Sequence, residues 1–281
     1  MIQRDHILWY KQPAKQWMEA LPIGNGRLGG MVFGQVENER IQLNEDSLWY
    51  GGPSDLHHPD TKKHIPEIRQ LLFEGKTKEA EFLASMAMTS APKYLKPYHP
   101  LCDLLIGFWD HPAAQAEEYR RELDMEKGVV RVSYKINGIR FTREIFASHT
   151  NQVMVLRFGC DQPEKLSMKA TLYRRPFDPG SRPDGTGTLI MNGRSGEDGV
   201  HYSCLLKAIS EGGTIKNIGD FLFIQRANAV TLILAAATSF RHESPEEICR
   251  QRVQHAVDAG FRSLKSRHED DHQEIFNRVQ L

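Results

Sequence analysis

Residues 130–145 constrain the fold most, because they predict a β-hairpin without help from any other part of the chain. Residues 130–136 and 139–145 alternate apolar with polar side chains, and Asn137-Gly138 stands between them. Alternation with a period of two is typical of strands with one buried face, and Asn-Gly suits a two-residue hairpin turn. The chain therefore contains antiparallel sheet with one face in a core.

Further strand-like stretches occupy most of the chain, and turn residues separate them. They lie at residues 28–49, 153–158, 166–172, 201–209, 221–225 and 230–236. Turns rich in Gly, Pro and Asp lie at residues 178–180, 183–185 and 212–213. Many short, closely spaced strands predict a mainly β protein, a large antiparallel β-sandwich or super-sandwich, over residues 1–243.

Two segments have helical periodicity instead. In residues 60–90 apolar side chains recur at helical spacing, with Asp60 as a candidate N-cap and Gly75 as a candidate stop. This helical pair is an insertion between strands. From Ser244 to Glu247 the residues predict a capping box, and helical spacing continues past Gly260 to the last residues. We therefore expect a helical linker at residues 244–281.

Composition argues against several kinds of partner. Lys plus Arg and Asp plus Glu number 36 each, so no basic field attracts nucleic acid. The start of the chain lacks an apolar signal-peptide core, and no apolar run approaches about 18 residues. We expect a cytoplasmic protein, if Met1 is the native start, without a membrane partner. Four scattered cysteines are expected to be reduced, buried thiols: Cys102, Cys160, Cys204 and Cys249.

Two motifs suggest chemistry but lack its context. Residues 24–29 match G-x-G-x-x-G, with Glu45 and Asp46 at the distance of a ribose-binding acid. A dinucleotide site needs a helix after the glycines, whereas residues 30–34 are strand-like. Residues 268–272 match H-E-x-x-H, a zinc motif, but a charged amphipathic linker helix explains them better. We expect no metal, although an upstream third ligand stays open.

Two other features would suit sugar chemistry. Glu45 and Asp46 form an acid pair, but glycoside hydrolysis needs carboxylates that face each other roughly 5–10 Å apart. Neighbours on a strand point to opposite faces, so bonding to backbone at a sheet corner is at least as good an interpretation. A set of aromatic side chains suits stacking on sugar rings: Trp9, Trp17, Trp49, Trp109, Tyr10 and Tyr50. We expect most of them to lie in the core.

The N-terminal segment carries a detailed resemblance to one enzyme family. The segments concerned are residues 8–17, 19–29, 31–34, 40–49 and 51–53. Shorter matches continue at residues 66–75, 119–124, 142–148, 232–240 and 268–279. These segments resemble bacterial glycoside hydrolases of family 95, the α-L-fucosidases, over nearly the whole chain. His99 and Cys102 depart from the pattern of that family.

The resemblance implies an architecture and an activity. In that family this stretch is a β-sandwich with a helical linker into an (α/α)6 barrel, so we expect the catalytic barrel to be missing from this chain. The family hydrolyses terminal α-L-fucosyl or α-L-galactosyl linkages with inversion. Its general acid Glu, and the Asn and Asp side chains that activate water, belong to the barrel, and none maps onto this chain. The implied partners are the chain's own barrel and a fucosylated oligosaccharide, without a cofactor.

Three hypotheses follow. The first is an accessory domain of an inverting α-L-fucosidase, with five residues directed toward the barrel at its active-site rim or the interdomain contact: Asn25, Arg27, Asn44, Glu45 and Trp49. The second is a free-standing carbohydrate-binding sandwich, which the same aromatic side chains would serve. The third is a metalloenzyme that uses His268 and His272. The resemblance favours the first.

Overall fold

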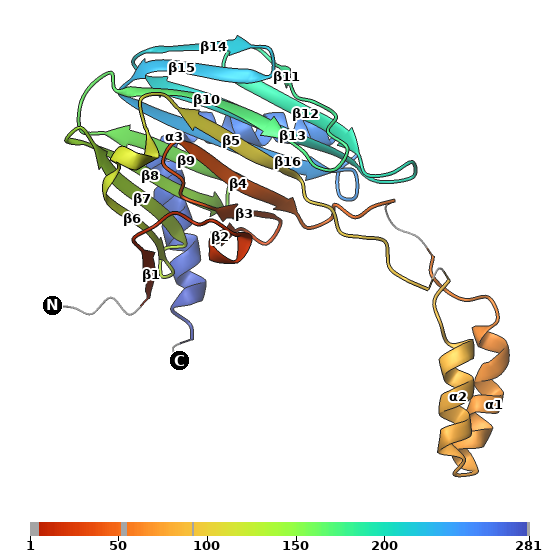
Figure 1. Ribbon diagram of the computed structural model, residues 1–281. Helices are drawn as coiled ribbons and strands as arrows, with labels where there is room; N and C mark the ends of the chain where they lie inside the picture. Colours follow the sequence, from red (N-terminus) through yellow and green to blue (C-terminus); the bar gives the residue numbers. More distant parts are fainter. Residues whose placement is uncertain (1–5, 52–54, 92, 280–281) are drawn as a thin grey trace.

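A computed structural model describes residues 6–51, 55–91 and 93–279. In this part of the chain two antiparallel sheets pack face to face, and three α-helices accompany them (Figure 1). The nine-stranded sheet has the order β1 (Ile7–Tyr10), β6 (Glu117–Asp124), β7 (Val129–Ile136), β8 (Ile139–Ser148), β9 (Val153–Cys160), β16 (Ala229–Thr238), β13 (His201–Glu211), β12 (Thr188–Arg194) and β11 (Arg182–Pro183). The mainly β sandwich expected from the sequence is thus confirmed.

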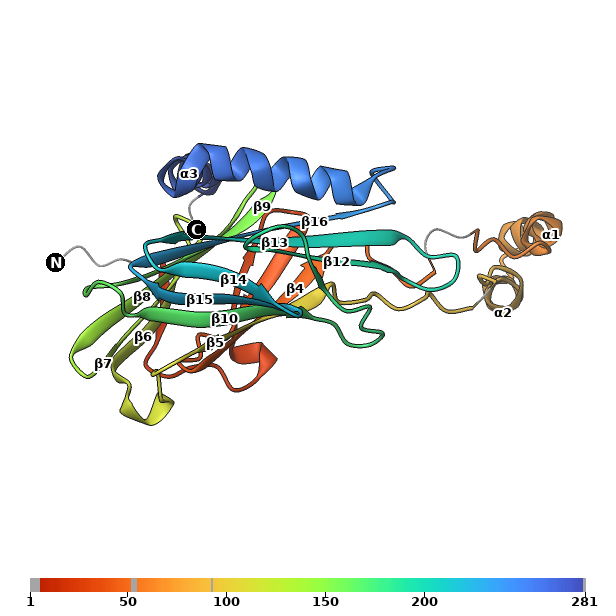
Figure 2. The ribbon, with the colours of Figure 1, turned by 90° about the horizontal axis from the view of Figure 1, so that it is seen from above.

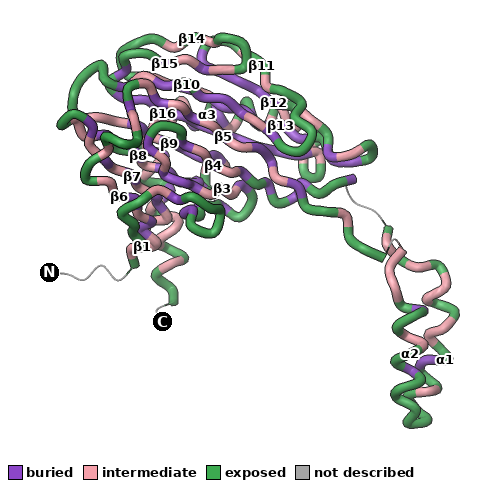
Figure 3. Tube along the Cα trace, in the orientation of Figure 1, coloured by how far each residue is buried: buried purple, intermediate pink, exposed green. Residues whose placement is uncertain are grey.

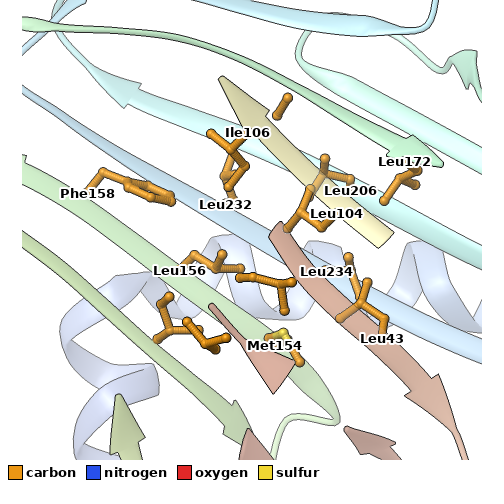
Figure 4. Close-up of a cluster of buried hydrophobic side chains, with 14 of the residues drawn as sticks. Leu43, Leu104, Ile106, Met154, Leu156, Phe158, Leu172, Leu206, Leu232 and Leu234 are labelled. Atoms are coloured by element: carbon orange, nitrogen blue, oxygen red, sulfur yellow. The ribbon is translucent and has the colours of Figure 1, made fainter. Parts of the chain in front are cut away.

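The second sheet has seven strands. Their order is β14 (Thr214–Ile218), β15 (Phe221–Ala227), β10 (Leu166–Tyr173), β5 (Cys102–Phe108), β4 (Asn38–Glu45), β3 (Leu28–Val32) and β2 (Leu21–Gly24). Alternate residues of the central strands enter the core, as in β5, where Leu104 and Ile106 are buried and Leu105 is partly exposed. Figure 4 shows Leu43, Leu104 and Ile106 facing Leu156 and Leu232 of the other sheet.

The predicted hairpin is confirmed. β7 and β8 pair in register from Val130 opposite Ile145 to Ile136 opposite Ile139. The turn residues Asn137 and Gly138 have φ values of 50° and 76°, the left-handed region that a two-residue turn requires.

The last helix, α3 (Pro245–Phe276), lies across the outer face of the nine-stranded sheet (Figure 2). It covers β16, which is therefore buried along its whole length. Gly260 has φ of 73° and interrupts the helix, so the second half runs back toward the turn between β6 and β7. The predicted helix is confirmed, but the capping box is wrong, because the Ser244 side chain makes no cap hydrogen bond.

Helices α1 (Thr61–Phe73) and α2 (Thr77–Ala87) form a hairpin that stands away from the sandwich (Figure 1). In the described residues they pack chiefly on each other. Gly75, with φ of 75°, separates them as expected. The predicted Asp60 cap is wrong, because its carboxylate pairs with Lys63 at 2.5 Å and caps no backbone N–H.

Two further expectations need correction. Cys102, Cys204 and Cys249 are buried, but Cys160 at the end of β9 is partly exposed. Most tryptophans are not core residues, since Trp9, Trp17 and Trp49 are 48%, 54% and 43% exposed. Trp9 is instead covered by the guanidinium of Arg120, 4.8 Å from its ring. Alternating strands at a sheet edge keep one face in water, and composition alone does not identify the edge strand.

Candidate functional site

The five residues singled out in the sequence meet at one end of the sandwich. We call this end the rim, and define it as residues 25–27 between β2 and β3, residues 44–50 at and beyond the end of β4, and residues 238–242 at and beyond the end of β16. Antiparallel pairing brings these segments together, because Leu28 lies opposite Glu45 and Gly29 lies opposite Asn44. Three chain segments separated by up to about two hundred residues thus form one surface.

Asn25 holds the rim together from inside. Its side chain is buried, and its Oδ1 accepts the backbone N–H groups of Arg27 (3.1 Å) and Leu28 (2.9 Å). Its Nδ2 donates to the carbonyl of Ser148 at the end of β8, 3.0 Å away. The glycine motif is therefore a tight hairpin turn that is bonded to the opposite sheet. A strand follows it, so the helix required by a dinucleotide site is absent from residues 28–32.

Glu45 and Asp46 are both held by other side chains. The buried Glu45 accepts hydrogen bonds from the N–H and Oγ of Ser47 at 2.8 and 2.6 Å. Asp46 forms a two-pronged ion pair with Arg241 at 2.7 and 2.6 Å, and Arg241 also reaches Glu45 at 3.4 Å. Burial raises the pKa of Glu45, and the hydrogen bonds from Ser47 oppose the shift. This geometry is that of a sheet corner rather than of an acid pair facing a substrate.

A short polar bridge joins the two sheets at the rim. The Oγ of Ser47 lies 2.5 Å from Oγ1 of Thr238 at the end of β16. The hydroxyl of Tyr98 donates to the carbonyl of Glu45 at 2.8 Å, and its ring lies 5.2 Å from that of Trp49. Burial raises the pKa of Tyr98 to about 12, so this hydroxyl keeps its proton. The bridge makes the position of Trp49 dependent on both sheets.

The outer surface of the rim carries charged and aromatic side chains. Arg27 and Asn44 are exposed, and Trp49 and Phe240 are 43% and 55% exposed. Burial, followed by the charges of Arg252, Arg27 and Arg241, lowers the pKa of His242. Asp46 and Glu45 offset the charge of Arg241, so this end of the sandwich presents both signs of charge beside its aromatic rings.

Sequence reasoning missed Arg241, Thr238, Tyr98 and His242. Arg241 lies 196 residues beyond Glu45 in the chain, and no local pattern links them. His99, noted as a departure from the family, is a neighbour of this region rather than part of its surface. Its Nδ1 lies 3.1 Å from Oγ of Ser195. Burial lowers the pKa of His99, which favours the neutral ring.

The H-E-x-x-H motif lies away from these contacts, on the second half of α3. Nε2 of His268 lies 3.1 Å from the carbonyl of Gly128, and Nε2 of His272 lies 2.8 Å from that of Met125. Within the described ranges, no three His, Cys, Asp or Glu side chains gather in a way that suits a metal ion. The two histidines fasten α3 to the turn between β6 and β7.

The fold and the rim define a class of protein, the large two-sheet β-sandwich domains with a helix across one outer face. Residues 8–243 match the family described as "Glycosyl hydrolase family 65, N-terminal domain", and the chain belongs to this family. Among the helices described, none is long and apolar enough to span a membrane.

Curated relatives are α-fucosidases. "Alpha-L-fucosidase 2" of Arabidopsis thaliana is 28% identical over 100% of this chain and 37% of its own length. "Probable alpha-fucosidase A" of Aspergillus niger is 26% identical over 93% of this chain and 35% of its own length. The chain thus spans little more than a third of these relatives. Its resemblance to the N-terminal part of α-L-fucosidases is confirmed.

A solved structure shares the fold at low sequence identity. "Putative kojibiose phosphorylase from human microbiome" superposes with a TM-score of 0.57 at 8% identity, over 96% of this chain and 38% of that one. At this identity the likeness concerns the fold alone. The sandwich with its helix is therefore a structural unit that also occurs in a much longer chain.

Proposed function

We propose that this chain is the N-terminal accessory domain of a family 95 glycoside hydrolase that removes terminal α-L-fucosyl, or α-L-galactosyl, residues with inversion. The proposal rests on the alignment of the whole chain with "Alpha-L-fucosidase 2" of Arabidopsis thaliana, at 28% identity. In the full-length protein the catalytic carboxylates lie in an (α/α)6 barrel outside this chain. The domain itself supports the barrel and is inactive alone.

The contacts of the rim carboxylates support a structural role for this domain and a catalytic role for the barrel. Inverting glycosidases need a general acid and a general base about 6.5–9.5 Å apart, with a water beside the base. Glu45 and Asp46 share Arg241, and Glu45 is also bonded to Ser47. A carboxylate whose lone pairs are occupied by a guanidinium and a serine is a poor proton acceptor for water. The rim therefore suits structural support better than acid–base chemistry.

The course of α3 supports a role for the rim at the interdomain contact. A carboxylate oxygen of Asp271 in α3 lies 3.3 Å from Nδ1 of His149. The residue before His149 is Ser148, whose carbonyl accepts the hydrogen bond from Asn25. The C-terminal part of the linker thus returns to the turns beside the rim. A barrel that follows α3 would start at this edge, where Arg27 and Trp49 are exposed.

The helical hairpin supports the same arrangement. Figure 1 shows α1 and α2 at the lower right of the sandwich and the C-terminal part of α3 at its lower left, near β1. The hairpin exposes Phe73 at 91% and Phe82 at 66%. Large exposed apolar side chains of this kind mark contact surfaces. We infer that the hairpin packs on the barrel in the full-length protein.

The test is fucose release by the full-length protein, with the 281-residue chain as the matched control. A fucosylated trisaccharide such as 2′-fucosyllactose is incubated with each protein, with and without inorganic phosphate. We expect phosphate-independent hydrolysis by the full-length protein, with the β-anomer of fucose seen first by NMR, and no release by the chain alone. Turnover by the chain alone, or turnover that requires phosphate as in a phosphorylase, would contradict the proposal.

A further inference from the structure

The two outer faces of the sandwich are covered differently. Helix α3 lies on the nine-stranded sheet, whereas no α-helix of the described part lies on the seven-stranded sheet (Figure 2). At the β3 end of that face, residues 14–20, which include the short 3-10 helix Trp17–Glu19, pack against Phe33. A groove with a volume of about 570 Å³ runs over this open face, across β4, β5 and β10. The groove is far from the rim. Asn38, at the first position of β4, lines the groove, and Glu45, at the last position, belongs to the rim; the two are about 23 Å apart at about 3.3 Å per residue.

The strand register builds the floor of the groove. Asn38 of β4 lies opposite Gly107 of β5, and Lys169 of β10 lies on the other side of Gly107. A side chain at Gly107 would fill this row, since its Cβ would lie 3.2 Å from Cε of Lys169 and 3.5 Å from Oδ1 of Asn38. In the next row Leu105 lies between Arg40 and Thr171. The floor is thus apolar and flat, with polar side chains on both sides.

Aromatic rings continue the floor toward β15. Phe221 lines the groove, and its ring lies 6.5 Å from that of Phe223. The ring of Trp109 lies 5.2 Å from that of Phe223. All three side chains are partly exposed. A row of rings beside an apolar floor fits a ligand that has flat C–H faces, such as a pyranose.

The polar side chains retain hydrogen-bonding capacity. Within residues 6–51, 55–91 and 93–279, the side-chain amide of Asn38 and the ammonium of Lys169 bond to no protein acceptor or donor; Lys169 instead lies 5.4 Å from the Phe221 ring. Amide and ammonium groups that face an apolar floor suit the hydroxyl groups at the edge of a sugar ring. The groove therefore offers both kinds of contact that a sugar makes.

Charge in the groove is nearly balanced. Arg40 pairs with Asp103 at 2.9 Å, and the buried Glu39 pairs with Arg143 at 2.6 Å. Lys169 and Lys15 are accompanied by Asp220 on the same lining. A binding site for phosphate or another anion concentrates cations without carboxylates nearby. The balance therefore favours a neutral ligand.

From these contacts we propose that the open face of the seven-stranded sheet binds a neutral oligosaccharide without cleaving it. The sugar ring lies over Leu105 and Gly107 beside Phe221, and Asn38 and Lys169 bond to its hydroxyl groups. This site goes beyond the accessory role at the rim, because it needs no catalytic barrel. A glycosidase that carries it would hold a glycan by two separate sites.

The experiment is calorimetric titration of the 281-residue protein with 2′-fucosyllactose, lactose and maltotriose, and separately with inorganic phosphate. We expect saturable binding of at least one sugar with a Kd in the millimolar range or below. The double variant Asn38→Ala/Lys169→Ala should weaken that binding at least about tenfold, because two hydrogen bonds are lost. Lys78→Ala, on exposed α2, is the matched control and should change nothing.

Three outcomes would overturn the proposal. They are no saturable binding of any of the three sugars up to about 10 mM, sugar binding that the double variant leaves unchanged, and binding of phosphate in place of sugar. Circular dichroism of the variant shows that loss of binding is not loss of fold. Fucose release by the full-length protein is measured separately, so failure here leaves the catalytic proposal intact.

Discussion

The sandwich and the α1–α2 hairpin differ in how much of their apolar side chains they bury. In the sandwich, side chains such as Leu104 and Leu232 are fully buried between sheets. In the hairpin, buried residues are limited, among those described, to Ile68, Ala80 and Ala87 (Figure 3). A pair of short helices without a third layer cannot enclose its apolar side chains. The sandwich therefore provides the stability, and the hairpin provides a surface.

The largest expected effect concerns the ion pair inside the sandwich. Arg143 and Glu39 are both buried and lie 2.6 Å apart, and Arg143 also donates to Tyr134 at 2.9 Å. Arg143→Ala leaves the buried Glu39 carboxylate without its cationic partner, with the N–H groups of Gly34 and Arg40 as its remaining donors. The free energy of unfolding should therefore fall by about 3–5 kcal/mol in urea denaturation. Arg143→Met with Glu39→Gln should recover part of the loss. A loss below about 1 kcal/mol would show that the pair is dispensable.

The next effect tests core packing directly. Leu104→Ala removes a fully buried side chain between the sheets and should lower the free energy of unfolding by about 3 kcal/mol. The measurement is urea denaturation followed by tryptophan fluorescence. A loss below about 1 kcal/mol would mean that the two sheets pack loosely at this point.

The stability of the sandwich should also depend on pH, because His111 is buried in it. Burial, with the charge of Arg143 as the second cause, lowers the pKa of His111 to about 4. The unfolded ring has a pKa near 6.5, so its contribution is complete above that pH and is lost as the pH falls toward 4. We expect a loss of about 3 kcal/mol over this range. His111→Phe should flatten the pH dependence of urea denaturation, and an unchanged slope would contradict the assignment.

The smallest effect is expected in the hairpin. Phe73 is 91% exposed, so Phe73→Ser should change the free energy of unfolding of the 281-residue chain by less than about 0.5 kcal/mol. In the full-length protein the same substitution should reduce fucose release or lower the melting temperature, because the proposed contact with the barrel is lost. Lys78→Ser serves as the control on the neighbouring helix. Equal behaviour of both variants in the full-length protein would remove the hairpin from the interdomain contact.

Much of the fold follows from short patterns in the chain. The alternation around Asn137-Gly138 and the helical spacing around Gly75 and Gly260 each predict a local structure that is present. These patterns succeed because backbone sterics and one-sided burial act over a few residues. The strand after Gly29 likewise excludes a dinucleotide loop from local context alone.

The candidate site was only partly predictable. Asn25 and Glu45 were recognised by resemblance, but their contacts with Ser148 and Arg241 were not. The exposure of Trp9 and Trp49 was also missed. Trp9 lies on the edge strand β1 and Trp49 lies beyond the end of β4, and the local sequence reveals neither position. Whether a ring lies in the core depends on which strand covers it.

By itself the sequence determined the mainly β class, the positions of the helices and of several strands, and the resemblance to α-L-fucosidases. Only the tertiary structure decided that β4 and β16 end side by side, so that Ser47 meets Thr238 and Asp46 meets Arg241. It likewise decided that one outer face lies under α3 and that the other, in the described residues, carries no α-helix. The physical reason is that periodicity reports burial along one strand, whereas the order of strands in a sheet depends on packing between distant segments.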